Sequence, residues 1–313
     1  MTTALRPMTT GELLDRTFNL YRNNFALFAG ISALAAGVLV AATVLLFSLG
    51  IALPTPGARV DPGAAMSAFA IYFAVLALFY LIGASLAAGA TIYAVSKVHL
   101  GQPVTIGESY SRVFPRLGRI INIILSIIIR MIGVFILMYL AVVLLVLVLG
   151  LALAGAVGRD GGYVIGVIVG ITVAVVGYGF VFAVYFIYSL SVQACLLENL
   201  KAGPALRRSS FLSKGSRWRI VLIYLLMGII GFALSYALHL PALWLVQRSV
   251  RVAIIWQFAA TFVAYTLSFP ISTIAISLVY YDQRVRKEAF DLQLMMESLG
   301  QAPQQAATAA PIG

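Results

Sequence analysis

Charged residues are scarce in this sequence: they make up 10% of its 313 residues, whereas 62% are hydrophobic. A soluble globular domain carries about 25% charged and about 45–50% apolar residues. A chain with so few polar side chains cannot cover itself against water, so most of its surface must face lipid. The composition therefore excludes an ordinary soluble protein.

Residues that carry catalysis or bind metals are equally scarce. The single cysteine, Cys195, excludes a disulfide framework and a cysteine-based metal cluster. The only histidines, His99 and His239, fall toward opposite faces of the membrane in the topology derived below, and none of the ten acidic residues lies deep within an apolar run. An ionisable group at such a depth would indicate a functional site. The sequence also contains no Gly-rich loop of the kind that binds phosphate. We therefore expect a protein that is not an enzyme and that uses no metal or cofactor.

Long apolar runs are what the sequence has instead. A membrane-spanning helix needs about 20 apolar residues, and six segments qualify: Phe25–Leu53, Met66–Ala94, Ile120–Leu153, Tyr163–Cys195, Ile220–Val246 and Val252–Tyr281. The sequence thus predicts an all-α integral membrane protein with six transmembrane helices. The first 24 residues contain no apolar run and include Glu12 and Asp15, so they are not a signal peptide and we expect them to be retained.

The distribution of the cations predicts the orientation. A net charge of +11 would favour a nucleic-acid partner in a soluble protein. Here, 16 of the 21 Lys and Arg residues fall in the two terminal segments and in the links between spans 2 and 3 and between spans 4 and 5; four fall on the other side, and Arg130 alone lies inside a span. Cytoplasmic loops carry the excess of Lys and Arg. We therefore expect a multi-pass protein of the cytoplasmic (inner) membrane with both termini in the cytoplasm, and no nucleic-acid partner.

Three of the basic stretches correspond to one another. The segment Thr9–Glu12 (TTGE) matches Thr105–Glu108 (TIGE) at a spacing of 96 residues, and a further 96 residues lead to a degenerate third copy near Gly203. Thr-x-x-Glu is a capping box, in which the hydroxyl and the carboxylate accept hydrogen bonds from backbone N–H groups at a helix start. Thr9 and Glu12, and likewise Thr105 and Glu108, are therefore predicted helix caps.

Apolar residues at helical spacing follow each predicted cap. They are Leu14, Phe18 and Tyr21 in the first copy and Tyr110, Phe114 and Leu117 in the second; Pro204, in place of the glutamate, is expected as the first residue of the third helix. A short helix with an apolar face and a basic face should lie in the membrane interface. We predict three repeats of an interfacial helix plus a transmembrane hairpin, at about residues 9–95, 105–195 and 203–281, within a single six-span domain of residues 1–299. Residues 300–313, rich in Gln, Ala and Pro, are predicted to form a disordered tail.

The two ends of the chain resemble a family of bacterial membrane proteins. The residues that carry the likeness are Leu5–Arg16 (LRPMTTGELLDR) and Tyr280–Glu288 (YYDQRVRKE), with the six spans between them. The family is related to the membrane domain attached to some glycerophosphoryl diester phosphodiesterases. In those enzymes hydrolysis belongs to a separate soluble barrel with acidic and histidine metal ligands, and this sequence shows no such domain. The resemblance therefore implies a fold and a location, and no hydrolytic activity.

Seven residues are candidates for binding anionic lipid. Six lie in the basic stretch that precedes the fifth span: Arg207, Arg208, Lys214, Arg217, Trp218 and Arg219. Cations near a cytoplasmic membrane surface attract acidic head groups at about 1 kcal/mol each, although the positive-inside rule requires the same charges. The seventh candidate, Arg130, is either an arginine that snorkels to the interface or a buried cation that binds an anionic head group or a substrate.

Two functions fit these features. The first is a non-enzymatic membrane protein that binds anionic lipid, or a membrane-protein partner, through a basic cytoplasmic face. The alternative is a transporter or transporter subunit for a small or lipid-like substrate, with a pathway lined by Arg130, Pro270, Ser268, Ser272 and Thr273, because a proline frees a backbone carbonyl within a helix. The oligomeric state stays open, since Gly166-x-x-x-Gly170 allows close approach of helices within one chain or between copies.

Overall fold

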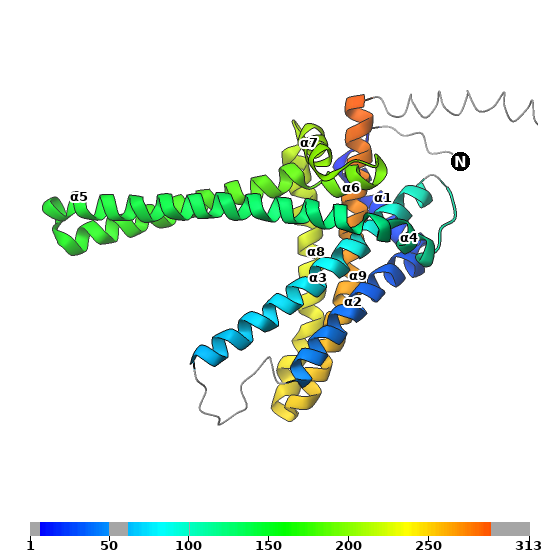
Figure 1. Ribbon diagram of the computed structural model, residues 1–313, viewed down its shortest axis with the longest axis horizontal. Helices are drawn as coiled ribbons and strands as arrows, with labels where there is room; N and C mark the ends of the chain where they lie inside the picture. The colour runs from blue at the N-terminus through cyan, green and yellow to red at the C-terminus, as the bar shows by residue number, and fades with distance from the viewer. Residues whose placement is uncertain (1–6, 50–61, 100, 289–313) are drawn as a thin grey trace, which may run out of the picture. The chain divides into compact units, whose positions relative to one another are not determined.

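The computed structural model describes residues 7–49, 62–99 and 101–288, which are helical almost throughout (Figure 1). The elements are α1 (Thr10–Asn23), α2 (Phe25–Ser48), α3 (Pro62–His99), α4 (Ile106–Val113), η1 (Phe114–Arg116), α5 (Leu117–Tyr188), α6 (Ser191–Leu197), α7 (Ala202–Ser213), α8 (Arg217–Arg248) and α9 (Val250–Glu288). No strand occurs in these ranges, so the predicted all-α fold is confirmed. The predicted tail 300–313 and the end of the first predicted span lie outside the described residues.

Six of the helical stretches are long and apolar enough to cross a membrane, so the chain is a multi-pass membrane protein. They are Phe25–Ser48, Ala65–His99, Ile106–Leu153, Asp160–Leu197, Arg217–Arg248 and Val250–Glu288. Their number and order agree with the prediction, but several extend beyond the predicted ends. The helix α3 continues to His99 and ends where Gly101 adopts a φ of +72°, with its amide bonded to the carbonyl of Val98. A helix persists into polar sequence until a residue such as glycine provides the left-handed conformation that terminates it.

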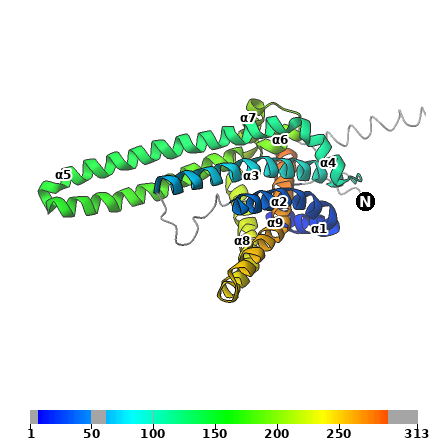
Figure 2. The same ribbon diagram turned by 60° about the horizontal axis from the view of Figure 1, so that its bottom comes forward.

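The helix α5 contains two spans and turns back on itself at Gly158. This glycine has φ +77° and ψ 161°, whereas the rest of α5 is helical. Only glycine adopts that region without strain, and here it reverses the chain within a single residue. The two limbs of α5, residues 117–157 and 159–188, consequently run side by side in both views (Figures 1 and 2).

The predicted Gly166-x-x-x-Gly170 motif lies on the second limb of α5 and faces the first limb. A Cβ added to Gly170 would lie 2.5 Å from Cγ2 of Val146, and one added to Gly166 would lie 3.0 Å from the carbonyl oxygen of Val146. Such distances leave no room for a larger side chain. The motif therefore packs the hairpin within one chain, as small residues do where membrane helices approach closely.

The chain divides into two compact units. Unit 1 contains residues 1–118, 196–199 and 218–313, and unit 2 contains residues 119–195 and 200–217. In unit 1, α2 packs against both α3 and α9, and α1 packs against α9. On α3 every described buried residue lies at or after Ser85, on α8 the buried residues are confined to its first third, and on α9 they are densest between Pro270 and Val285. The core of unit 1 therefore lies at the ends of these spans that adjoin the basic segments.

Unit 2 is held together by the packing of α7 against the end of α5. The hydroxyl of Ser209 donates to the carbonyl of Ile187 (2.9 Å) and accepts from the amide of Leu190 (3.1 Å), and the hydroxyl of Ser213 also donates to Ile187 (3.2 Å). These bonds satisfy backbone groups where α5 ends and the chain passes to α6. The buried side chains of unit 2 include Cys195 and Leu212.

Candidate functional site

The helix α1 begins with a reciprocal capping box. The hydroxyl of Thr9 accepts from the amide of Glu12 (3.2 Å), and the Glu12 carboxylate accepts from the amide of Thr9 (2.8 Å). Both amides belong to the first turn, where backbone N–H groups have no partner within the helix. The structure thus places both residues as the local pattern predicts.

The helix α4 starts with only half of this arrangement. The hydroxyl of Thr105 accepts from the amide of Glu108 (3.2 Å), but the Glu108 carboxylate accepts from the hydroxyl of Tyr93 on α3 (2.8 Å). A tyrosine on the preceding span therefore competes for the carboxylate. Glu108 consequently ties α4 to α3 as well as occupying the capping position.

The helix α7 begins without a side-chain cap. Its N-cap residue is Lys201, and its first residue is Ala202. Pro204 was predicted to be the first residue of this helix, but it is the third. The missing N–H of proline is tolerated there because the first turn of a helix lacks acceptors for its N–H groups.

The three short helices bury corresponding positions. Buried residues spaced by 96 positions form two sets: Leu13, Ser109 and Ala205, and Thr17, Val113 and Ser209. A phenylalanine is exposed beside each buried face, with exposed fractions of 39% for Phe18, 67% for Phe114 and 53% for Phe211. The predicted apolar residues therefore divide between two faces: Tyr21 is buried, whereas Phe18 is exposed.

The basic candidates around α7 are mostly exposed. Arg207, Lys214 and Arg217 are exposed, Arg208 is half-buried and Trp218 is 86% exposed. Arg207 and Phe211 are four residues apart and therefore share one face of α7, and Lys214 is the residue that follows the end of the helix. The structure thus places an aromatic side chain between two cations on the surface of unit 2.

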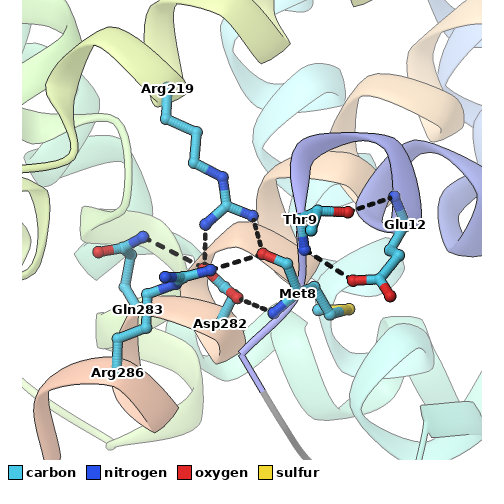
Figure 3. Close-up of polar contacts among 7 residues, drawn as sticks. All are labelled: Met8, Thr9, Glu12, Arg219, Asp282, Gln283 and Arg286. Carbon is cyan, nitrogen blue, oxygen red and sulfur yellow. Dashed lines mark hydrogen bonds and ion pairs between the residues drawn. The ribbon is translucent and has the colours of Figure 1, made fainter.

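Arg219 does not belong to that surface. Its Nη1 donates to Oδ2 of Asp282 (2.5 Å), and its Nη2 donates to the carbonyl of Met8 (2.7 Å) (Figure 3). The Arg219 side chain is 18% exposed and that of Asp282 is fully buried. The guanidinium of Arg219 therefore neutralises a buried carboxylate, and its two terminal nitrogens are directed into the protein and not toward the surface.

Arg286 completes the same cluster. Its Nε donates to Oδ2 of Asp282 (2.8 Å), and its Nη2 donates to the carbonyl of Met8 (2.6 Å). The amide of Met8 donates in turn to Oδ1 of Asp282 (2.7 Å). The five groups form one closed network, which joins the segment before α1 to the start of α8 and the end of α9 (Figure 3). A network of this kind favours one particular packing of the elements that it connects.

A second polar cluster lies beside it on α9. The Glu198 carboxylate accepts a hydrogen bond from the hydroxyl of Tyr280, and Nε of Arg284 lies 3.8 Å from Glu198 and 3.3 Å from Glu288. Both clusters draw on the segment Tyr280–Glu288, which carries the resemblance stated above. Single-sequence reasoning missed them because several of their partners are distant in the chain. The signal available was two carboxylate–arginine pairs at a spacing of four residues at the end of a span, Asp282 with Arg286 and Arg284 with Glu288.

Arg130 extends from the first limb of α5. Its Nη1 donates to the carbonyl of Ser126, one turn earlier (2.8 Å), and its Cζ lies 5.3 Å from the centre of the Tyr188 ring. The side chain is exposed and reaches back toward the start of α5. This conformation is typical of a snorkelling arginine.

The residues of the predicted transport pathway are divided between the two units. Arg130 belongs to unit 2, whereas Ser268, Pro270, Ser272 and Thr273 belong to α9 in unit 1. The hydroxyl of Ser268 donates to the carbonyl of Ala264, and that of Thr273 donates to the carbonyl of Phe269. These hydroxyls are therefore used within their own helix.

The two histidines have separate environments. The His99 ring stacks on Tyr281 at 5.2 Å, and Nη2 of Arg16 lies 3.4 Å from its Nδ1. Burial lowers the pKa of Arg16 below its ordinary value. His239 lies in α8, with Nδ1 2.6 Å from the carbonyl oxygen of Ser235. Among the described residues, no group of three His, Cys, Asp or Glu side chains could hold a metal ion.

Comparisons with family models, with curated proteins and with solved structures find no match for this chain.

Proposed function

We propose that this chain is a non-enzymatic protein of the cytoplasmic (inner) membrane that binds anionic phospholipids through its three short helices. Each of α1, α4 and α7 lies before or at the start of an odd-numbered span, so all three fall on the same side of the membrane, the side with the excess of Lys and Arg. In this proposal each helix opens one of three repeats and lies in the interface, with both termini in the cytoplasm.

The observation that supports this proposal most directly is the exposed face of α7. Arg207 lies one turn before Phe211 on that face and the exposed Lys214 follows the end of the helix, while Ser209 and Leu212 are buried. An apolar side chain at the boundary between head groups and acyl chains, with cations at the level of the phosphates, is the arrangement by which amphipathic helices bind anionic membranes. The corresponding exposed phenylalanines of α1 and η1 extend the same chemistry to the other two helices.

Cations near these other phenylalanines support the same interpretation. Arg22 is exposed one turn after Phe18, and Arg112 and Arg119 are exposed on either side of Phe114. A surface that binds a folded protein would be expected to contain few charged residues at its centre. The repeated pairing of one aromatic residue with cations instead favours a phospholipid surface as the partner.

The test is a comparison of two matched double variants of the full-length protein in mild detergent. Native mass spectrometry measures the apparent Kd for phosphatidylglycerol and for phosphatidylcholine. Arg207→Glu/Arg217→Glu should weaken phosphatidylglycerol binding by about 30-fold or more, because each cation near the surface contributes about 1 kcal/mol.

The control reverses two exposed arginines at the opposite ends of the spans, Arg248→Glu/Arg251→Glu. This variant should leave phosphatidylglycerol binding within about twofold of the unmodified chain, and phosphatidylcholine binding should change little in either variant. Equal losses in both double variants, or no loss in the first, would overturn the proposal. Arg219 stays unchanged throughout, because its substitution would disrupt the Asp282 cluster.

A further inference from the structure

Arg130 carries a positive charge on the lipid-facing side of a span. It lies 13 residues after the start of α5, which corresponds to roughly 20 Å at a rise of 1.5 Å per residue. Its neighbours Ile129 and Ile132 are exposed large apolar side chains, as expected where a helix meets acyl chains. A cation at such a place is costly unless an anion or water reaches it.

The guanidinium is held in place by both limbs of the α5 hairpin. One N–H donates to the carbonyl of Ser126 on the first limb, and the plane of the Tyr188 ring on the second limb supports the cation at 5.3 Å. Because the Arg130 side chain reaches back to Ser126, its charge lies about one helical turn, or roughly 5 Å, nearer the start of α5 than its Cα atom does. The two contacts thereby fix the position of the charge relative to the α5 hairpin.

Most of the hydrogen-bonding capacity of this guanidinium remains available to a ligand. An arginine has five N–H donors, and a single hydrogen bond of Arg130 is found in the described part of the chain. Among those residues no carboxylate pairs with it. A cation–π contact occupies one face of the guanidinium and leaves its edges free to bind a phosphate bidentately.

Polar side chains lead from the start of α5 to this cation. Asn122, Ser126 and Arg130 are spaced by four residues and therefore lie along one face of the helix. The hydroxyl of Ser126 donates to Oδ1 of Asn122 (3.3 Å), and Arg119 is exposed less than one turn earlier. A head group at the membrane surface thus meets polar contacts down to the guanidinium.

We propose that Arg130, with Asn122, binds the phosphate of a phospholipid whose acyl chains lie against the isoleucines of α5. This inference rests on the proposed lipid binding and deepens it by assigning one bound lipid a site on α5, separate from the exposed face of α7. The ligand is a lipid phosphate and not free phosphate, because the exposed apolar side chains Ile129 and Ile132 beside Arg130 would contact the acyl chains of a lipid.

The experiment uses native mass spectrometry of the full-length protein with phosphatidylglycerol, and adds diacylglycerol or inorganic phosphate as competitors. Arg130→Gln should weaken the most tightly bound phosphatidylglycerol by about tenfold, and Arg130→Lys should be intermediate because lysine keeps the charge but loses the planar fork. Arg251→Gln is the matched control and should bind as the unmodified chain does. Neither competitor should displace the lipid at equal concentration.

Equal binding by Arg130→Gln and the unmodified chain would overturn the proposal, as would displacement by diacylglycerol or by inorganic phosphate. Asn122→Leu provides a second variant that keeps the cation, and it should weaken the same lipid by a smaller factor. The Arg130→Gln effect should persist in the Arg207→Glu/Arg217→Glu background. If Arg207→Glu/Arg217→Glu alone has no effect but Arg130→Gln still weakens binding, the Arg130 site is supported and the interfacial surface of α7 is rejected.

Discussion

The amide of Met8 donates a hydrogen bond of 2.7 Å to the carboxylate of Asp282, a residue 274 positions later in the chain. Two arginines close the network around this pair, each donating to both the Asp282 carboxylate and the Met8 carbonyl. The segments that carry the family resemblance therefore contact each other through specific bonds. This contact gives Asp282 and Arg286 a structural role at the end of α9.

Asp282→Asn should destabilise the protein strongly. The change removes the negative charge that two guanidinium groups share, and the loss of one partner from a buried ion pair costs about 3–5 kcal/mol. Thermal unfolding in detergent measures the effect as a lower Tm. The control Asp160→Asn alters an exposed carboxylate and should change stability by no more than about 0.5 kcal/mol. Equal Tm values for the two variants would show that the network does not hold the ends of the chain together.

The cap of α1 and the tether of α4 should each contribute measurably to stability. Thr9→Ala removes the hydroxyl that accepts from Glu12 and should cost about 1 kcal/mol. Tyr93→Phe removes the hydrogen bond to Glu108 and should cost a similar amount, about 1 kcal/mol. Chemical unfolding of detergent-solubilised protein gives both values. Thr10→Ala, one residue beyond the α1 cap, is the reference and should be close to neutral; a loss as large as that of Thr9→Ala would contradict the assigned cap.

Two glycines of α5 should respond to alanine with opposite signs. Gly158 adopts φ +77° and ψ 161°, so Gly158→Ala should destabilise the hairpin by about 1–3 kcal/mol. Gly133 lies within the first limb with nothing near its missing Cβ, so Gly133→Ala should stabilise it by up to about 1 kcal/mol. A Tm shift of the same sign in both variants would argue against a turn at Gly158.

The sequence predicted contacts between residues that are close in the chain better than contacts between residues that are far apart. Thr9 and Glu12 are three residues apart, so the pattern alone was enough to predict their reciprocal bonds. The same pattern at Glu108 was incomplete because its partner, Tyr93, lies on another helix. Arg219 was placed with the lipid-binding cations because a run of basic residues says nothing about a carboxylate 63 positions away.

The apolar face of α1 shows a second limit. Leu14, Phe18 and Tyr21 have helical spacing, yet the helix buries Leu13, Thr17 and Tyr21 and exposes Phe18. Periodicity identifies which residues share a face but not whether that face meets protein or lipid. In a membrane protein both environments accept apolar side chains, so burial within the chain cannot be separated from contact with lipid by hydrophobicity alone.

The most direct test of interfacial lipid binding is the depth of the three exposed phenylalanines in a bilayer. Single cysteines at positions 18, 114 and 211, in a Cys195→Ala background, carry spin labels in full-length protein reconstituted into phosphatidylglycerol-containing vesicles. Power saturation with oxygen and an aqueous nickel complex reports each depth, and position 160 serves as the water-exposed reference. If the three short helices lie in the interface, all three labels should lie about 5–10 Å within the boundary between head groups and acyl chains. Labels as accessible to nickel as that at position 160 would contradict this placement.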